Sequence, residues 1–190
     1  MKFKVLRQAS ILAVVVTALA ACSPGRADEG DPSRLKVVTT VAPITSIAAS
    51  IGGSKVSITG LVPEGTNSHT FEPPPSASVD LSKADVVLVN GLRLEEPTKE
   101  LAAQTMNDDA VLVELGTTVL PEADYVYDFS FPEDEGKPNP HLWTDPTWAI
   151  KYAEVISESF SAAGPDNASY YQQNLEAFRR QATALADALR

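Results

Sequence analysis

The chain has 190 residues, a formal net charge of −10 and a single cysteine. One cysteine excludes an intramolecular disulfide and a thiolate metal cluster, so apolar packing has to hold the fold together. An acidic surface disfavours nucleic acid as a partner and attracts cations in general.

The N-terminus has the pattern of an export signal. Three basic residues precede an uncharged run over 9–20, which is shorter than the roughly 20 apolar residues that span a bilayer. The run ends in Leu-Ala-Ala-Cys, which resembles the lipobox of bacterial lipoproteins and predicts lipidation of Cys22. We therefore predict a signal peptide over 1–21 and a lipid-anchored tether over 22–33. The alternative is an ordinary signal that ends at a cysteine by chance.

From residue 34 onward, short β-branched runs alternate with helical patterns. Such alternation predicts right-handed crossovers and a parallel sheet with helices on both faces, which is an α/β fold. The expected strands cover 35–40, 56–62, 85–90 and 111–115, and the expected helices between them cover 44–51, 77–83 and 95–106.

Two long helices should follow a polar stretch over 117–140. The first opens at Asp145, an N-cap acid followed by proline, and ends at a Gly-Pro pair. Apolar residues at helical spacing predict the second from near Asn167 onward. We place one domain over 34–165 and the start of a further helix over 166–190.

Acidic residues in two places favour structural roles. Glu95 and Glu96 stand where the helix over 95–106 should begin, and acids there suit the helix dipole. The acidic stretch over 124–135 contains no histidine, and such carboxylates usually form a solvated surface.

The two histidines, His69 and His141, both lie in loops. His69 follows the second strand, so its loop should leave the sheet at the carboxyl edge, where open parallel sheets bind ligands. Prolines after His69 and on either side of His141 stiffen both loops. Two neutral imidazoles at one edge could share a zinc ion. They match no short-range ligand motif, so a pair of hydrogen-bonded loop histidines is the alternative.

Three stretches of the sequence resemble one family. They are Gly-Thr-Asn-Ser-His-Thr-Phe-Glu-Pro-Pro-Pro-Ser around His69, Ala-Asp-Val-Val-Leu-Val-Asn-Gly-Leu-Arg-Leu-Glu over 84–95, and Asn-Pro-His-Leu-Trp-Thr-Asp-Pro around His141. Together with the lipobox, they resemble the zinc/manganese solute-binding lipoproteins of ABC importers, which are TroA-like, helical-backbone metal receptors. The similarity runs from about Leu35 to the end of the chain.

The resemblance implies a four-stranded parallel sheet, a receptor domain over 34–165 and His69 and His141 as metal ligands. It implies Zn²⁺ or Mn²⁺ as the transported ligand and the permease subunit of an ABC importer as the partner. It also implies anchorage through lipidated Cys22 to the outer face of the cytoplasmic membrane.

The family completes its metal site from a second domain. That domain supplies a histidine or glutamate and a carboxylate, and a long backbone helix joins it to the first domain. We expect residues 166–190 to be the start of that helix and the second domain to be missing from this chain. Two histidines alone leave a tetrahedral ion with two open positions, so we expect far weaker zinc binding than in a complete receptor.

An enzyme, a surface adhesin and a truncated receptor are the alternatives to this function. A metal-assisted hydrolase normally needs about three protein ligands and a general base. The sequence has no third histidine, no Gly-x-Ser-x-Gly elbow and no phosphate-binding glycine loop, so we expect no enzyme. A surface adhesin is an alternative, because some relatives of the family are described in that way. A non-functional truncated receptor is another.

Overall fold

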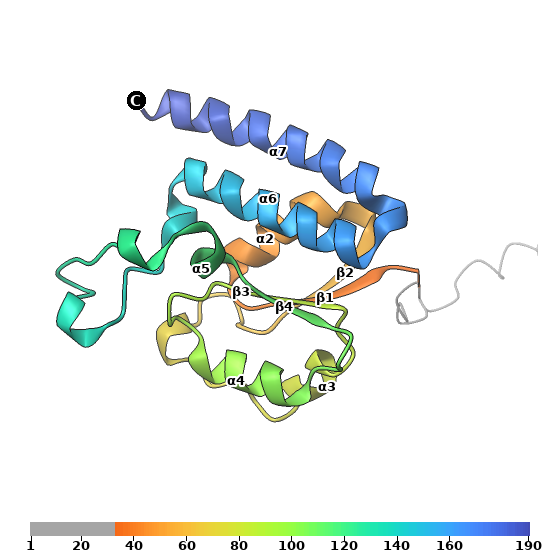
Figure 1. Cartoon of the computed structure of the whole chain (residues 1–190), viewed down its shortest axis with the longest axis horizontal. Helices are drawn as coiled ribbons and strands as arrows, with labels where there is room; N and C mark the ends of the chain where they lie inside the picture. Colours follow the sequence, from red (N-terminus) through yellow and green to blue (C-terminus); the bar gives the residue numbers. More distant parts are fainter. Residues whose placement is uncertain (1–32) are drawn as a thin grey trace, which may run out of the picture. The chain divides into compact units, whose positions relative to one another are not determined.

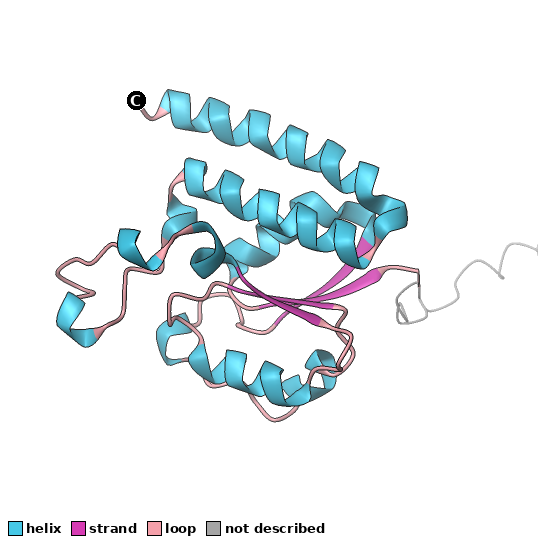
Figure 2. Ribbon diagram, in the orientation of Figure 1, coloured by secondary structure: helices cyan, strands magenta, loops and turns pink. Residues whose placement is uncertain are grey.

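The computed structural model describes residues 33–190, so the predicted signal peptide, Cys22 and nearly all of the tether lie outside the described part. Four strands alternate with helices, and longer helices follow them (Figure 2). In chain order the elements are β1 (Leu35–Thr39), α2 (Ala42–Gly52), β2 (Val56–Gly60), α3 (Ala77–Leu81), β3 (Val86–Val89), α4 (Glu96–Thr105), β4 (Val111–Glu114), α5 (Leu115–Val119), α6 (Pro146–Ala163) and α7 (Ala168–Ala188).

The strands form one sheet in the order β2-β1-β3-β4, and every neighbouring pair is parallel. Helices α2, α6 and α7 lie on one side of the sheet, and α3 and α4 lie on the other (Figure 1). Successive side chains of a strand point to opposite faces, so Val37 packs under the first group of helices and Val38 under the second. This burial of both faces explains the continuous apolar runs, and it confirms the predicted α/β fold.

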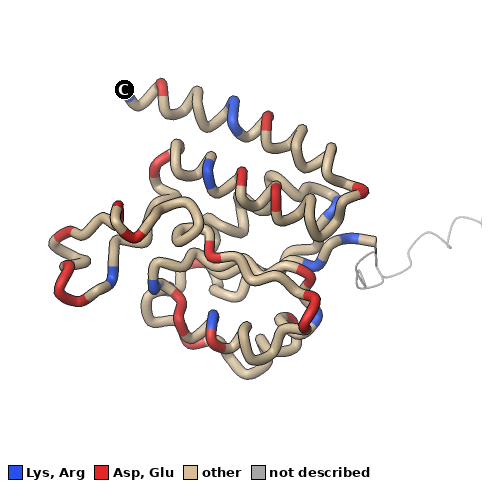
Figure 3. Tube along the Cα trace, in the orientation of Figure 1, with Lys and Arg blue, Asp and Glu red and all other residues tan. Residues whose placement is uncertain are grey.

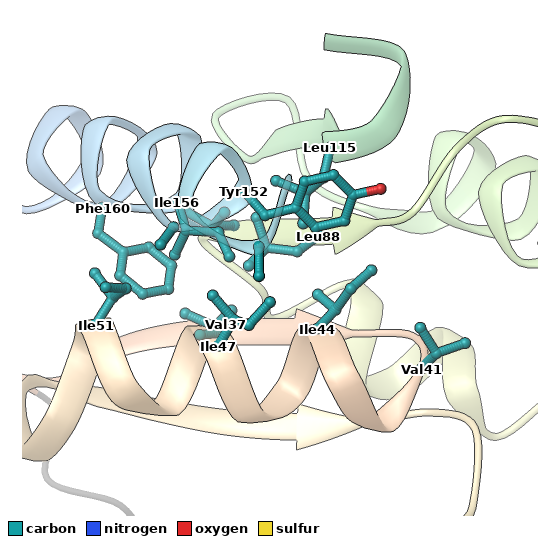
Figure 4. Close-up of a cluster of buried hydrophobic side chains, with 14 of the residues drawn as sticks. Val37, Val41, Ile44, Ile47, Ile51, Leu88, Leu115, Tyr152, Ile156 and Phe160 are labelled. Atoms are coloured by element: carbon teal, nitrogen blue, oxygen red, sulfur yellow. The ribbon is translucent and has the colours of Figure 1, made fainter. Parts of the chain in front are cut away.

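The larger core lies between the sheet and helices α2, α6 and α7. Its contributions from α2 and α6 recur at every third or fourth position, which is the spacing of one helix face. They are Ile44, Ile47, Ile51, Tyr152, Ile156 and Phe160, none of them more than 6% exposed (Figure 4). From α7, Tyr171 packs edge-on against Phe160 with ring centroids 5.5 Å apart, which fixes α7 onto α6.

Helix α6 begins as the sequence predicts. The side chain of Asp145 accepts a hydrogen bond from the main-chain N–H of Thr147 at 2.8 Å and another from the Thr147 hydroxyl at 2.6 Å. The first satisfies one of the N–H groups that have no partner inside the helix, and Pro146 needs none.

Replacing Asp145 with alanine should therefore lower the free energy of unfolding by about 1 kcal/mol. Asparagine also caps helices, so Asp145→Asn should keep most of the stability that the cap contributes. Urea denaturation of Asp145→Ala and Asp145→Asn measures both. Equal stabilities for wild type and the alanine variant would show that this cap contributes nothing.

The sequence did not predict helix α5, which follows β4 directly. The polar stretch expected over 117–140 begins inside helix α5. The first turn of α5 docks on the end of β3, where the N–H of Gly116 donates to the carbonyl of Asn90 at 2.7 Å.

Among the described helices, none is both long and apolar enough to cross a membrane.

Candidate functional site

The carboxyl edge of the sheet contains its topological switch point. The chain leaves β1 toward β2 on one side, whereas β3 pairs with β1 on the other, so the connections diverge between β1 and β3. Ligands of open α/β sheets bind at such a point. His69 lies in a 3-10 turn, Ser68–Thr70, in the connection that follows β2, and His141 directly precedes the turn Leu142–Thr144 and α6.

The structure brings these two histidines together. The Nε2 atoms of His69 and His141 are 3.2 Å apart, and their ring centroids are 5.2 Å apart. Two nitrogens that each lie about 2.0–2.1 Å from one tetrahedral zinc ion are separated by about 3.3–3.4 Å. The metal-free rings therefore already have nearly the spacing that a shared zinc ion requires.

Local hydrogen bonds shape the His69 turn. The side-chain oxygen of Asn67 accepts from the main-chain N–H of His69 at 3.0 Å, and the N–H of Thr70 donates to the carbonyl of Asn67 at 3.3 Å. Phe71 packs against the larger core directly after the turn. The imidazole of His69 is thus exposed to solvent while its backbone is fixed on both sides.

His141 is held more tightly than His69. The side-chain oxygen of Asn139 lies 3.0 Å from the main-chain nitrogen of His141 and 2.9 Å from its Nδ1 atom. The ring of Trp143, half-buried against the core, lies edge-on to the imidazole at 5.2 Å. Burial, followed by the charge of His69, lowers the pKa of His141 from its ordinary value, which favours the neutral ring that can ligate a metal ion.

Asn90 ties the His141 loop to the sheet. This fully buried residue follows β3, and its side-chain nitrogen donates to the carbonyl of Pro140 at 3.1 Å. Its side-chain oxygen accepts from the hydroxyl of Tyr152 at 2.7 Å. Burial raises the pKa of Tyr152, so that hydroxyl stays protonated and remains a donor. The residue before His141 is thereby fixed to both β3 and α6.

A buried carboxylate supports the strained loop beside Asn90. Glu95 is 4% exposed and accepts hydrogen bonds from the Thr40 hydroxyl at 2.6 Å, the Asn90 N–H at 2.7 Å and the Gly91 N–H at 3.2 Å. Gly91 and the two residues after it all have positive φ, a conformation that costs about 1–2 kcal/mol for each residue other than glycine. Burial raises the pKa of Glu95.

The two acids at the start of α4 have different roles. Glu96 lies in the first turn of α4, where its charge suits the helix dipole as predicted. Glu95 makes no side-chain cap of that helix and instead binds the loop that precedes it, a role that the sequence did not predict.

Three further residues at the site were missed by sequence reasoning. Asp128 and Phe131 close a tight turn with two main-chain hydrogen bonds of 2.9 and 3.0 Å. The ring of Phe131 lies 5.6 Å from that of His69 and 5.5 Å from that of His141. Asn139 donates its side-chain N–H to Asp128 at 2.7 Å. This bond, followed by one from the N–H of Ser130, lowers the pKa of Asp128.

Most of the acidic stretch is solvated, as predicted. Acidic residues recur along the loop between α5 and α6 (Figure 3). Glu133–Glu135 in this loop are exposed. Asp128 is also exposed, but its carboxylate has a specific partner, because it binds Asn139, the residue that contacts His141. The signal that could have found it is the Asx-turn pattern, in which Asp or Asn accepts from the N–H two residues later; Asp128 does so with Ser130 and Asn139 with His141.

The site is built from two imidazoles. Across residues 33–190, no group of three or more histidines, cysteines or carboxylates is close enough to hold a metal ion. The described residues therefore supply two nitrogen ligands, one from His69 and one from His141. Any further ligand of a metal ion at this site has to be something other than a histidine, cysteine or carboxylate of residues 33–190.

Comparison with known proteins identifies the family. The family model described as the periplasmic component A of the zinc-uptake complex, ZnuA, matches residues 37–190. The chain belongs to this ZnuA family. Members of this family are the substrate-binding proteins of ABC importers, and this is not an enzyme class.

Two relatives illustrate the family. The manganese ABC transporter substrate-binding lipoprotein PsaA of Streptococcus mitis is 31% identical over 175 residues, which cover 88% of this chain and 54% of the relative. The manganese-binding lipoprotein MntA of Halalkalibacterium halodurans is 36% identical over 168 residues, which cover 87% and 53%. The chain thus spans about half the length of these relatives.

Solved structures of periplasmic metal-binding proteins agree with the fold. The Mn-bound periplasmic metal-binding protein from Candidatus Liberibacter asiaticus is 26% identical with a TM-score of 0.68, over 78% of this chain and 53% of that one. The periplasmic zinc-binding protein TroA from Treponema pallidum has a TM-score of 0.73 at 23% identity, over 83% and 54%, which shows a shared fold.

Proposed function

We propose that this chain provides half of the metal site of an extracytoplasmic receptor that captures zinc or manganese for an ABC importer. His69 and His141 are the ligands that it contributes. The observation that carries the proposal is the 3.2 Å separation of their Nε2 atoms at the switch point of the sheet. The family model for a zinc-uptake component and relatives that are named manganese-binding support the choice of cargo.

The surroundings of the rings favour a metal site over two ordinary loop histidines. Loop histidines that merely satisfy hydrogen bonds do not need matched rigid turns, an aromatic ring against both imidazoles and a network that ties one of them to the sheet. Rings fixed in advance lose little conformational entropy when they bind an ion. The acidic surface adds a general attraction for cations.

The position in the cell and the partner are further parts of the proposal. Cys22 carries the lipid that anchors the receptor to the outer face of the cytoplasmic membrane, and the permease subunit of the importer receives the ion. The lipobox pattern at 19–22 and the naming of the relatives as lipoproteins of ABC transporters support both.

Calorimetric titration of the chain with zinc chloride tests the proposal. We expect one ion per chain, a dissociation constant well above the nanomolar range, and weaker binding of manganese because imidazole nitrogens favour zinc. Magnesium, which prefers oxygen ligands, is the control and should give no binding heat. Absence of zinc binding, or several equivalent ions per chain, would contradict the proposal.

A further inference from the structure

We infer that Asn139 and Asp128 are positioning residues that fix the tautomer of His141 and so leave its Nε2 atom free to ligate a metal ion. The inference deepens the proposed function and rests on it. Three contacts carry it: Asp128 Oδ2 to Asn139 Nδ2 at 2.7 Å, Asn139 Oδ1 to His141 N at 3.0 Å, and Asn139 Oδ1 to His141 Nδ1 at 2.9 Å.

The orientation of the Asn139 amide follows from its two neighbours. An ionised carboxylate only accepts hydrogen bonds, so the Asn139 atom that faces Asp128 must be the amide nitrogen. The main-chain N–H of His141 only donates, so the atom that faces it must be the amide oxygen. Both neighbours require the same orientation, and Oδ1 of Asn139 therefore points at the imidazole of His141.

The amide orientation determines where the ring proton lies. An amide oxygen accepts and does not donate, so Nδ1 of His141 must carry the proton. Nε2 of the neutral ring is then bare, and it faces Nε2 of His69 at 3.2 Å. In the metal-free chain the proton between the rings belongs to His69. His69 must shift that proton to its own Nδ1, by exchange with water, before it can ligate as well.

The chain from carboxylate to amide to imidazole resembles a general arrangement at metal sites. A ligating histidine usually donates its other ring N–H to a carboxylate, carbonyl or water, which fixes its tautomer and orientation. Here an amide stands between the carboxylate and the ring. Loss of such an outer partner typically weakens metal binding about 10–100-fold.

Asp128 has a second effect through its other oxygen. Oδ1 accepts from the N–H of Ser130 at 2.8 Å and from the N–H of Phe131 at 3.2 Å, which stabilises the turn that places the Phe131 ring against both imidazoles. One carboxylate thus orients the partner of His141 and an apolar neighbour of the site.

Nitrogen-15 NMR of the labelled, metal-free chain tests the inference, because protonated and bare ring nitrogens have widely separated shifts. At a pH well above the ordinary histidine pKa of about 6.5, we expect wild-type His141 to carry its proton on Nδ1. Asp128→Ala removes the acceptor that orients the Asn139 amide and should weaken this tautomer preference. Asn139→Ala should lose the preference and bind zinc about 10–100-fold more weakly.

Asn107→Ala is the matched control. Asn107 is more exposed than Asn139, but its side chain likewise accepts from the N–H two residues later, that of Asp109 at 3.1 Å, and it lies before β4 at the amino edge of the sheet, away from the histidines. This variant should leave the His141 tautomer unchanged.

The outcomes separate the inference from the function on which it rests. Wild-type His141 protonated on Nε2 would overturn the inference whether or not zinc binds, and so would an Asn139→Ala variant with unchanged tautomer and affinity. A chain with His141 protonated on Nδ1 that does not bind zinc would support the tautomer assignment and contradict the proposed function instead.

Discussion

Replacing His141 with alanine is expected to weaken zinc binding by about 100-fold or more while leaving the fold intact. Loss of a residue that hydrogen-bonds to a metal ligand typically lowers metal affinity about 10–100-fold. Loss of one of only two described ligands should therefore lower zinc affinity by at least about 100-fold. The ring is half-exposed in a loop, so we expect the free energy of unfolding to change by no more than about 1 kcal/mol. Calorimetry and urea denaturation measure the two effects.

The single variants and the double variant together show whether the rings share one ion. His69→Ala should lose as much affinity as His141→Ala, and the double variant should lose little more, because residues that act on one ion are not additive. Losses that simply add would indicate two independent weak sites and would contradict a shared ion.

Replacing Glu95 with alanine is expected to lower the free energy of unfolding by about 3 kcal/mol or more. The change leaves the Thr40 hydroxyl and the N–H groups of Asn90 and Gly91 without their acceptor, and each buried unsatisfied group costs about 1–3 kcal/mol. Glu100→Ala, an exposed position on the same helix α4, should change stability by no more than about 0.5 kcal/mol. Similar losses for the two variants would show that the network contributes little.

Glu95 also gives stability a defined pH dependence. Because burial raises its pKa above the ordinary 4.5, the native chain binds this proton more tightly than the unfolded chain does. Stability from this group is therefore full below pH 4.5 and is lost as the pH rises through the raised pKa. Glu95→Gln cannot titrate, so wild type should lose stability relative to it over that window. Urea denaturation across the pH range measures this difference, and a constant difference would refute the shift.

The fold was largely predictable because its signals are local. Runs of β-branched residues and the Asp145 cap depend on neighbours in sequence, and the predicted strands differ from the observed ones only by one or two residues at their ends. Helix α5 was not predicted, because its position depends on a hydrogen bond from the N–H of Gly116 to the carbonyl of Asn90, a residue far away in the sequence.

The site was predictable only in part, for the same physical reason. The strand order and the proline-stiffened loops bring His69 and His141 to one edge, but nothing periodic marks the partners of those rings. Asp128, Phe131 and Asn139 come from a loop whose conformation depends on side-chain to main-chain hydrogen bonds. Such bonds can be suspected from an Asx pattern, whereas the contact with His141 requires the folded chain.

Anomalous diffraction at the zinc absorption edge, from crystals of the chain grown with zinc chloride, tests the shared site most directly. One strong peak is expected at the carboxyl edge of the sheet, about 2.0–2.1 Å from the Nε2 atoms of both His69 and His141. A zinc ion bound through only one of the two rings would contradict the shared site. So would zinc bound elsewhere while the imidazoles of His69 and His141 remain in contact with each other.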